Sequence, residues 1–356
     1  MSLSRLVIED LRCIERADLT FARRRSLIVG PNGAGKTTIL EAIHLLGRGR
    51  SFRTRQNAQL VRRTKARFTV FGEIRAEKGD GAGRVGVGFE AGRLEGRIDG
   101  VAMAGLVELA RRLPVYVVDP RVHQLIEAGP SERRRFMDAG VFHVEQGYLA
   151  SWRGYRRALS QRNAALKSGH GAAVDAWTAP LVAAAVEVDA ARSVYVEALG
   201  RAVGEVGERL LGVGIGVRYL RGWRADETLE EALERHRSRD SLTGVTQAGP
   251  HRADLAVDFD EGSVRERASR GQQKLVAAAL ILGQVAEFAR RTGRAGTLLV
   301  DDPAAELDDE ALERLLAEVD RLDAQQIVTG LRLAPLRPRP DDGRFHVERG
   351  VVQPML

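Results

Sequence analysis

The residues with the clearest chemical meaning are two glycines separated by four residues and followed by a lysine and a hydroxyl. The apolar run 26–29 before them predicts a short buried strand, and apolar residues at helical spacing after them predict a helix. In that context, backbone N–H groups and a helix N-terminus can hold phosphate groups. The sequence therefore predicts a nucleotide-binding P-loop, which consists of Gly30, Pro31, Asn32, Gly33, Ala34, Gly35, Lys36, Thr37 and Thr38.

Two acidic residues complete the chemistry that a P-loop implies. In such a loop Lys36 reaches the β- and γ-phosphates, and the Thr37 hydroxyl is a ligand of Mg²⁺. The buried strand predicted over 297–300 is followed by Asp301 and Asp302, the arrangement known as Walker B. Such a strand brings one carboxylate to the metal and a second to the attacking water. We expect ATP and Mg²⁺ as cofactors, with Asp301 on the metal and Asp302 as the catalytic carboxylate.

A third pattern lies upstream of the Walker B strand, at the predicted start of a helix. Ser269 is placed as the N-cap, and a small residue followed by glycine at a helix start forms an anion site. In this position the pattern matches the signature motif of ABC-type ATPases, which faces the γ-phosphate held by another subunit. We therefore expect a homodimer to form on ATP binding, with Ser269, Gly271 and Gln272 acting in trans.

The residues after the Walker B strand predict slow turnover. Residues 305–308 occupy the place of the D-loop, which crosses the dimer interface in this class, and Asp308 is a further catalytic candidate. The next predicted strand ends at Thr329, where many members of the class have a switch histidine. Asp302 replaces the more usual glutamate, so its shorter carboxylate would lie further from the water. Both features predict slow ATP hydrolysis.

The overall charge favours a polyanionic partner. The 356 residues include 55 Lys and Arg against 48 Asp and Glu, a formal net charge of +7. Only five of the 55 are lysines, so base composition of the genome can account for part of the arginine content. The basic segment 48–67 contains no acid, and it fits either a solvated loop or contact with the phosphates of ATP or DNA. The candidate DNA-binding residues are Arg50, Arg53, Arg55, Arg62, Arg63 and Lys65.

Other residue types argue against several classes of protein. The single cysteine, Cys13, excludes an internal disulfide, and the seven histidines show no metal-binding spacing. The longest aliphatic run, 275–282, is far shorter than the ~20 residues that span a bilayer, and the N-terminus has no signal-peptide pattern. We expect a cytoplasmic protein without a membrane partner.

The order of hydrophobic patterns predicts a discontinuous α/β protein. Alternating runs over 68–98 predict an antiparallel β-meander, and helical spacing over 145–211 predicts an antiparallel helical hairpin. We predict an ABC-type P-loop ATPase head, with a mixed sheet, helices and the β-meander, from residues 1–118 and 246–356. Residues 119–245 form an inserted helical arm lobe in this prediction. The three tryptophans of the middle region are expected as core anchors.

Taken together, these segments resemble the RecF family of bacterial recombination-repair proteins. The segments occur in the family's order along essentially the whole chain. Two of them, the Gly-Arg-Ser-Phe-Arg-Thr segment at 49–54 and the Gly-Pro-His-Arg segment at 249–252, are more specific than the Walker motifs. The segments are Leu11-Arg12, the P-loop, Gly49-Arg50-Ser51-Phe52-Arg53-Thr54, Arg134-Arg135-Phe136-Met137-Asp138, Gly249-Pro250-His251-Arg252-Ala253-Asp254-Leu255 and Ser269-Arg270-Gly271-Gln272-Gln273.

The resemblance implies a head domain similar to that of SMC proteins, without their long coiled coil. It also implies a weak DNA-dependent ATPase that dimerises with ATP and contacts the backbone of duplex DNA and of single-strand/double-strand junctions. Such proteins act in the cytoplasm, at the nucleoid, with RecR and RecO to place RecA at single-strand gaps, and they serve replication and the SOS response. This chain departs from the family pattern at Arg270 and Ala305, and Gln124 is a candidate for the Q-loop glutamine.

Other ATPases share the Walker motifs, including SMC-like proteins, transporter ATP-binding subunits and nucleases of the overcoming-lysogenisation type. The interval from Lys36 to Ser269 is longer than a transporter subunit needs. The residues after Asp308 are too few for the metal-dependent nuclease domain that the last class usually carries.

Overall fold

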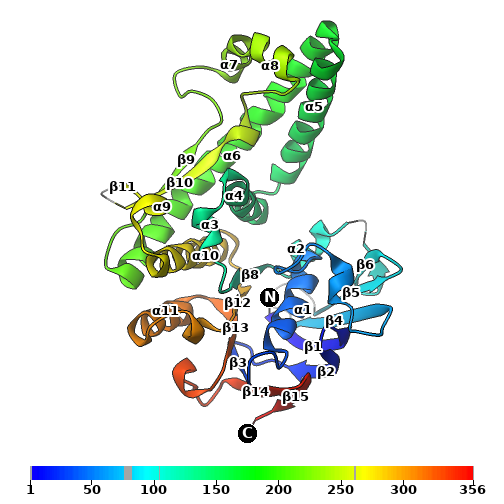
Figure 1. Ribbon diagram of the computed structural model, residues 1–356, viewed down its shortest axis with the longest axis vertical. Coiled ribbons are helices and arrows are strands. Elements are labelled where there is room, and N and C mark those ends of the chain that lie inside the picture. Colours follow the sequence, from blue (N-terminus) through cyan, green and yellow to red (C-terminus); the bar gives the residue numbers. More distant parts are fainter. Residues whose placement is uncertain (1, 76–81, 104, 260–261, 356) are drawn as a thin grey trace. The chain divides into compact units, whose positions relative to one another are not determined.

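The protein contains two compact units (Figure 1). The computed structural model describes residues 2–75, 82–103, 105–259 and 262–355. The first unit comprises Met1–Val122 and Val285–Leu356, and the second unit, His123–Gln284, is inserted between them. Residues 246–284 therefore group with the second unit, whereas the sequence prediction assigned them to the head. The physical reason is that β10 (Asp254–Phe259) pairs antiparallel with β9 (Gly216–Leu220), a half-exposed strand that the sequence pattern does not predict.

A six-stranded sheet forms the centre of the first unit, in the order β15-β14-β3-β13-β12-β8 (Figure 1). Its neighbours pair in parallel from β14 to β8, and β15 is antiparallel to β14. All residues of β3, β12 and β13 are buried, as is typical of parallel strands covered on both faces. The strands are β3 (Arg25–Val29), β8 (Val115–Val118), β12 (Gly296–Val300), β13 (Ala324–Gly330), β14 (Gly343–Glu348) and β15 (Val351–Pro354).

A second, antiparallel sheet of the first unit has the order β2-β1-β4-β5-β6-β7. Burial alternates along β4 and β5, so each strand turns one side-chain row towards the core. This sheet contains the β-meander predicted over 68–98. Its strands are β1 (Ser2–Leu11), β2 (Ile14–Thr20), β4 (Arg67–Arg75), β5 (Gly83–Glu90), β6 (Arg93–Ile98) and β7 (Val101–Ala102).

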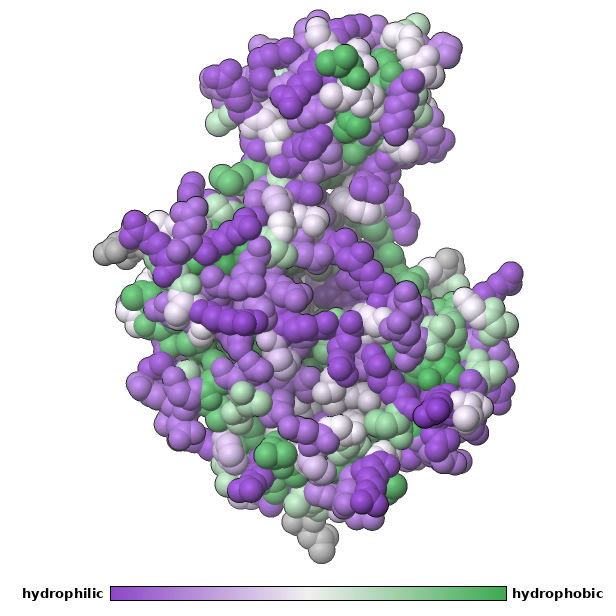
Figure 2. Space-filling view, in the orientation of Figure 1, coloured by the Kyte–Doolittle hydropathy of each residue, from purple (hydrophilic) through white to green (hydrophobic). Residues whose placement is uncertain are grey.

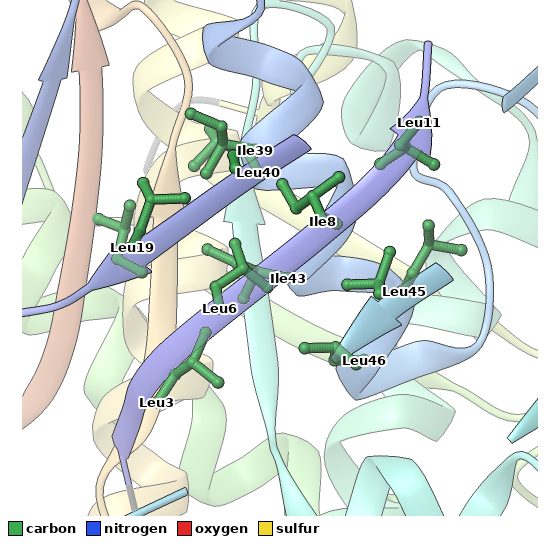
Figure 3. Packing of buried hydrophobic residues seen from close by; sticks show 14 of the residues in the cluster. Leu3, Leu6, Ile8, Leu11, Leu19, Ile39, Leu40, Ile43, Leu45 and Leu46 are labelled. Atoms are coloured by element: carbon green, nitrogen blue, oxygen red, sulfur yellow. The ribbon is translucent and has the colours of Figure 1, made fainter. Parts of the chain in front are cut away.

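Helix α1 (Lys36–Arg48) carries the apolar face that the sequence predicted after the P-loop. Its residues Ile39, Leu40 and Ile43 are fully buried and belong to one core cluster with Leu6 and Ile8 of β1 (Figure 3). Burying one such aliphatic side chain stabilises the fold by about 1.5–3 kcal/mol. This packing fixes the helix that follows the P-loop. The other helices of the unit are η1 (Asn57–Leu60), α2 (Val107–Arg112), η3 (Pro303–Ala305), α11 (Asp309–Arg321) and η4 (Ala334–Leu336).

The second unit is built on a hairpin of two antiparallel helices, α5 (Tyr148–Ser168) and α6 (Gly171–Leu211). Gly169 ends α5 with a φ of 72°, a left-handed conformation that glycine adopts without strain. The remaining elements are α3 (Gln124–Glu127), α4 (Pro130–Val144), β9, α7 (Leu229–Arg235), α8 (Arg237–Thr243), η2 (Pro250–Arg252), β10, β11 (Gly262–Ser263), α9 (Val264–Arg267) and α10 (Arg270–Thr292), whose last turns belong to the first unit.

Helix α6 is the one described helix that is long and apolar enough to cross a membrane by length and composition. It nevertheless buries two charged residues in ion pairs. Asp189 accepts a hydrogen bond from Arg221 at 2.8 Å, and Arg192 pairs with Asp138 at 2.8 Å. Such pairs favour α6 as a core helix of the hairpin. The face in Figure 2 is also mostly hydrophilic, with apolar side chains in scattered groups.

The tryptophans differ from their predicted role as core anchors, because Trp152, Trp177 and Trp223 are all only partly buried. The guanidinium of Arg156 lies 5.5 Å from the ring centre of Trp152, and that of Arg221 lies 5.0 Å from the ring centre of Trp223. Two of the three rings thus support arginines at the surface of the second unit.

Hydrogen-bond contacts of His251 fix the Gly-Pro-His-Arg segment in the second unit. The Tyr155 hydroxyl lies 2.5 Å from His251 Nδ1, and His251 Nε2 lies 2.9 Å from the carbonyl oxygen of Thr246. A neutral imidazole satisfies both contacts if Nε2 donates and Nδ1 accepts. Burial is the main cause that lowers the pKa of His251 to about 4, so the ring is neutral at pH 7.

We expect His251 to make folding sensitive to acid. Its pKa is depressed in the folded protein from 6.5 to about 4, so the stabilising neutral form is complete above pH 6.5 and is lost as pH falls towards 4. The free energy of unfolding should drop by up to about 1.4 kcal/mol per pH unit from this proton. Urea unfolding at about pH 7 and about pH 5 measures it. His251→Gln should show a weaker pH dependence, and the exposed His170→Gln should match the wild type; equal dependence in all three proteins would contradict the assignment.

Candidate nucleotide-binding site

The P-loop lies between the end of β3 at Val29 and the start of α1 at Lys36. At Gly30 a Cβ atom would lie 2.0 Å from the carbonyl oxygen of Val347 in β14, so any other residue would clash with backbone. Gly33 has a φ of 77°, which glycine adopts at little energetic expense. These glycines are therefore required by the path of the loop itself.

Lys36 is buried and its ammonium lies against the loop. Its Nζ donates hydrogen bonds to the carbonyl oxygens of Gly30 at 2.7 Å and of Pro31 at 3.1 Å. Both acceptors are neutral, so the contacts leave the positive charge of the ammonium uncancelled. The geometry thus places a cation inside the loop, where a nucleotide's terminal phosphates would bind.

The predicted metal residues Thr37 and Asp301 meet at the start of α1. The Thr37 hydroxyl lies 3.0 Å from both carboxylate oxygens of Asp301, and the Thr329 hydroxyl donates to Asp301 Oδ1 at 2.8 Å. Burial raises the pKa of Asp301, with the two hydroxyls opposing that rise and the charges of Asp119 and Asp302 adding to it. Several carboxylates near one buried position favour a cation there.

The donor set fits Mg²⁺, which prefers carboxylate and hydroxyl oxygens and keeps phosphate and water oxygens among its ligands. Among the described residues no group of three or more His, Cys, Asp or Glu side chains could hold a metal ion. A cation at Asp301 and Thr37 would therefore need the nucleotide and water to complete its ligands.

Asp302 and Thr329 lie side by side at the ends of β12 and β13. Asp302 has a φ of 47°, a left-handed conformation that costs a non-glycine residue about 1–2 kcal/mol. Its backbone N–H donates to the Thr329 hydroxyl at 2.9 Å, while that hydroxyl donates to Asp301. The residue in the expected switch position therefore connects the two Walker B aspartates.

The predicted trans residues lie in the second unit, whereas the P-loop and Asp301 lie in the first. Ser269 Oγ accepts from the backbone N–H of Gln272 at 3.3 Å, and Gln272 Oε1 accepts from the backbone N–H of Ser269 at 2.9 Å. This reciprocal pair begins α10, and Ser269, Gly271 and Gln272 are all exposed. A long helix thus presents its N-terminus and these residues to solvent.

Two further candidates have local roles. Asp308 is exposed and caps α11, where its Oδ1 accepts from the backbone N–H of Ala311 at 2.8 Å. This contact gives Asp308 a structural function whether or not it takes part in catalysis. Gln124, the Q-loop candidate, is exposed at the first residue of α3 in the second unit.

Glu41, a fully buried residue of α1, has a role that the sequence patterns do not predict. Arg12 pairs with it through Nε at 2.5 Å and Nη2 at 2.8 Å, and the Ser51 hydroxyl donates to its Oε1. Ser51 Oγ in turn accepts from the backbone N–H of Arg53 at 2.9 Å. Glu41 thereby fastens the turn after β1 and the Gly-Arg-Ser-Phe-Arg-Thr segment to the P-loop helix. The one sequence signal for this role is that Glu41 is an acidic residue at a position of α1 where the helical pattern places apolar residues.

The basic segment is only partly available to a ligand. Arg62 pairs with Glu15 at 2.8 Å, and Lys65 lies 3.5 Å from Asp10. Arg53 lies 3.9 Å from Glu41. Within the described chain, the exposed Arg50 and Arg63 have no acidic side chain at ion-pair distance.

Comparison with known proteins identifies the family. Residues 2–337 match the family described as RecF/RecN/SMC N terminal domain. The chain is 38% identical over 361 residues to DNA replication and repair protein RecF of Edwardsiella ictaluri, covering 99% of each chain. It is 37% identical over 360 residues to the protein of the same name from Azotobacter vinelandii, covering 99% of this chain and 98% of that one.

Solved structures show the same fold. The structure described as the recombination mediator protein RecF-ATP in the RecFOR pathway has a TM-score of 0.89 at 24% identity, covering 99% of this chain and 97% of that one. An Smc head bound to the C-winged helix domain of ScpA has a TM-score of 0.60 at 16% identity, covering 100% of this chain and 97% of that one. The predicted ABC-type ATPase head with an inserted helical lobe is confirmed. The family match over 2–337 and the RecF relatives at 37–38% identity together place this chain in the RecF family.

Proposed function

We propose that this chain is an ATP-gated dimer that binds DNA and promotes RecA loading at single-strand gaps with RecR and RecO. The observation that carries the proposal is the meeting of Thr37, Asp301 and Thr329 beside the P-loop lysine. The names of the similar proteins support the repair role, since they are called DNA replication and repair proteins.

The first unit binds the nucleotide in this proposal. Lys36 exchanges its contacts with two loop carbonyls for oxygens of the β- and γ-phosphates. Thr37 and Asp301 hold Mg²⁺, which neutralises phosphate charge when bound. Asp302 orients the attacking water, and its position is fixed by the bond from its backbone N–H to Thr329.

The same contacts support slow hydrolysis. The Thr329 hydroxyl is engaged with Asp301 and with the backbone of Asp302, and a hydroxyl does not titrate near pH 7 as a histidine does. The site therefore has no proton acceptor at the end of β13. In this proposal the main function of the site is to keep ATP bound, because bound ATP keeps the two subunits together.

Dimerisation completes the nucleotide site from a second molecule. Ser269, Gly271 and Gln272 lie at the exposed N-terminus of a 23-residue helix, where N–H groups and the helix dipole favour an anion. We propose that they contact the γ-phosphate held by the partner's P-loop. Binding of ATP would then shift the population from monomers to dimers that close on DNA.

We expect Lys36→Met to weaken ATP binding strongly. The substitution removes charged hydrogen bonds to phosphate worth up to about 3 kcal/mol, which corresponds to about 100-fold in affinity. Titration with a fluorescent ATP analogue measures the loss. Lys167→Met, at an exposed position of α5 in the second unit, is the matched control and should bind as the wild type does. Full affinity in Lys36→Met would rule out the P-loop as the site.

We expect Ser269→Arg to keep ATP binding but to remain monomeric, because a bulky cation would occupy the place of the partner's phosphate. Sedimentation velocity with and without ATP measures the dimer. Ser238→Arg, at an exposed position of α8 in the same unit, carries the same change and should still dimerise. If the Ser269→Arg protein dimerised normally with ATP, the trans role would be wrong.

For DNA, we expect Arg50→Gln combined with Arg63→Gln to weaken duplex binding. Each lost phosphate contact should reduce the slope of log affinity against log salt by about 0.9. Fluorescence anisotropy across a salt series measures the slope. Arg62→Gln is the control, because Arg62 already pairs with Glu15. An unchanged slope in the double variant would exclude this segment as the DNA site.

A further inference from the structure

The Gly-Pro-His-Arg turn of the second unit, residues 249–252, is held in place by three other elements. Arg192 of α6 donates to the carbonyl oxygen of Pro250 at 2.7 Å. Arg134 of α4 donates to the carbonyl oxygen of Ala253 at 2.7 Å. Tyr155 of α5 contacts the imidazole of His251 and accepts from its backbone N–H at 3.3 Å. The turn is therefore a fixed platform.

Three arginines, one in this turn and two on the helices α4 and α5 that hold it, have no acidic side chain at ion-pair distance in the described chain. Arg134 is partly exposed, and Arg156 and Arg252 are exposed. Arg252 donates only to neutral oxygens, those of Thr246 at 3.4 Å and Gln247 at 3.2 Å. No carboxylate of the described chain lies at ion-pair distance from any of the three.

The acids nearest the turn are already used by other arginines. Asp138 accepts from Arg192 and from the Tyr148 hydroxyl, and Asp254 accepts from Arg133 through both oxygens at 2.8 Å. The negative charges of Asp138 and Asp254 are thus largely neutralised by Arg192 and Arg133. The arginines at the surface keep a net positive field.

The electrostatics of His251 agree with this geometry. Burial is the largest cause of its lowered pKa, and the charges of Arg252, Arg134 and Arg156 lower the pKa further. Burial and the like charges of Arg192 and Arg252 also lower the pKa of Arg134, against the opposing charges of Asp254 and Asp138. Three guanidinium groups thus act on one imidazole from different elements.

We propose that Arg134, Arg156 and Arg252 form a phosphate-binding surface on the second unit that takes the sugar-phosphate backbone of duplex DNA. This rests on the proposed DNA-binding function and says where part of that binding occurs. The exposed Arg153 and Arg157 extend the surface along α5. Guanidinium groups on a rigid base match phosphate oxygens by their planar pairs of donors.

The surface fits a backbone better than bases or a protein partner. The guanidinium of Arg156 lies 5.5 Å from the ring centre of Trp152, so one face of that ring is already engaged by a cation. The turn contains no exposed large apolar residue among those described. Such residues of the second unit, for example Val186, Val194 and Leu242, lie outside the turn. Protein interfaces depend on buried apolar or aromatic anchors, whereas backbone binding depends on charge.

The test uses the full chain with Arg156→Gln and Arg252→Gln together, and a fluorescent duplex oligonucleotide as the probe. Losing two phosphate contacts should reduce the slope of log affinity against log salt by about two. The control combines Arg201→Gln with Arg237→Gln, two exposed arginines of the same unit that already pair with Glu197 and with Asp175 and Glu234. This control has the same change in net charge, and its slope should equal that of the wild type.

Several results would overturn the assignment. The assignment would be wrong if the Arg156/Arg252 variant had the wild-type slope of log DNA affinity against log salt. In that case the wild type would still bind DNA, and the proposed function would stand. Absence of DNA binding by the wild type would instead remove the proposed function as well. Calorimetry with inorganic pyrophosphate tests a second reading. If the double variant lost pyrophosphate binding but kept the wild-type slope of log DNA affinity against log salt, the surface would be a site for free anions, and its assignment to DNA would be overturned. If the double variant is thermally destabilised, Arg156→Gln alone decides, with an expected loss of slope of about one.

Discussion

The buried carboxylate of Asp301 is the group on which the arrangement of the first unit depends. It follows β12, and it accepts hydrogen bonds from Thr37 at the start of α1 and from Thr329 near the end of β13. Burial disfavours its charge, and the two hydroxyls partly offset that penalty. Because the three residues come from three elements, this interaction sets the P-loop helix against the ends of two parallel strands, at the point where phosphates would bind.

Charge compensation has the same importance in the second unit. Arg162 pairs with Asp240 and Arg192 pairs with Asp138, in each case with a guanidinium that is almost fully buried. Loss of one partner from a buried pair typically destabilises a protein by about 3–5 kcal/mol. These interior pairs take up the acids near the Gly-Pro-His-Arg turn, and the surface arginines around it are left with a positive field. The same interactions therefore stabilise the hairpin and leave, at the surface that we propose for DNA, arginines without acidic partners.

The site residues that the sequence predicted are those defined by local patterns. The P-loop needs only a strand, glycines and a helix that are contiguous in the chain, and the pairing of Thr37 with Asp301 follows from a buried parallel strand. Glu41 escaped prediction because its partners Arg12 and Ser51 lie 29 and 10 residues away, on segments with no sequence signal for contact. The predicted head boundary at residue 246 differs from the structure because β10 pairs with β9, and a five-residue strand with half-exposed residues gives almost no periodic signal.

The sequence by itself determined the family, and it predicted the nucleotide-binding loop and the Walker B aspartates, because each depends on residue types at short, fixed spacings. Only the tertiary structure decided which charges are free. Arg62 and Arg63 are neighbours in one basic segment, yet Arg62 pairs with Glu15 across the fold and Arg63 has no acidic partner in the described chain. Arg252 likewise lies close to Arg134 only because α4 reaches its turn, where Arg134 donates to the carbonyl oxygen of Ala253. Coulomb interactions act through space, so the charge pattern that a ligand meets is set by the fold and not by the order of residues.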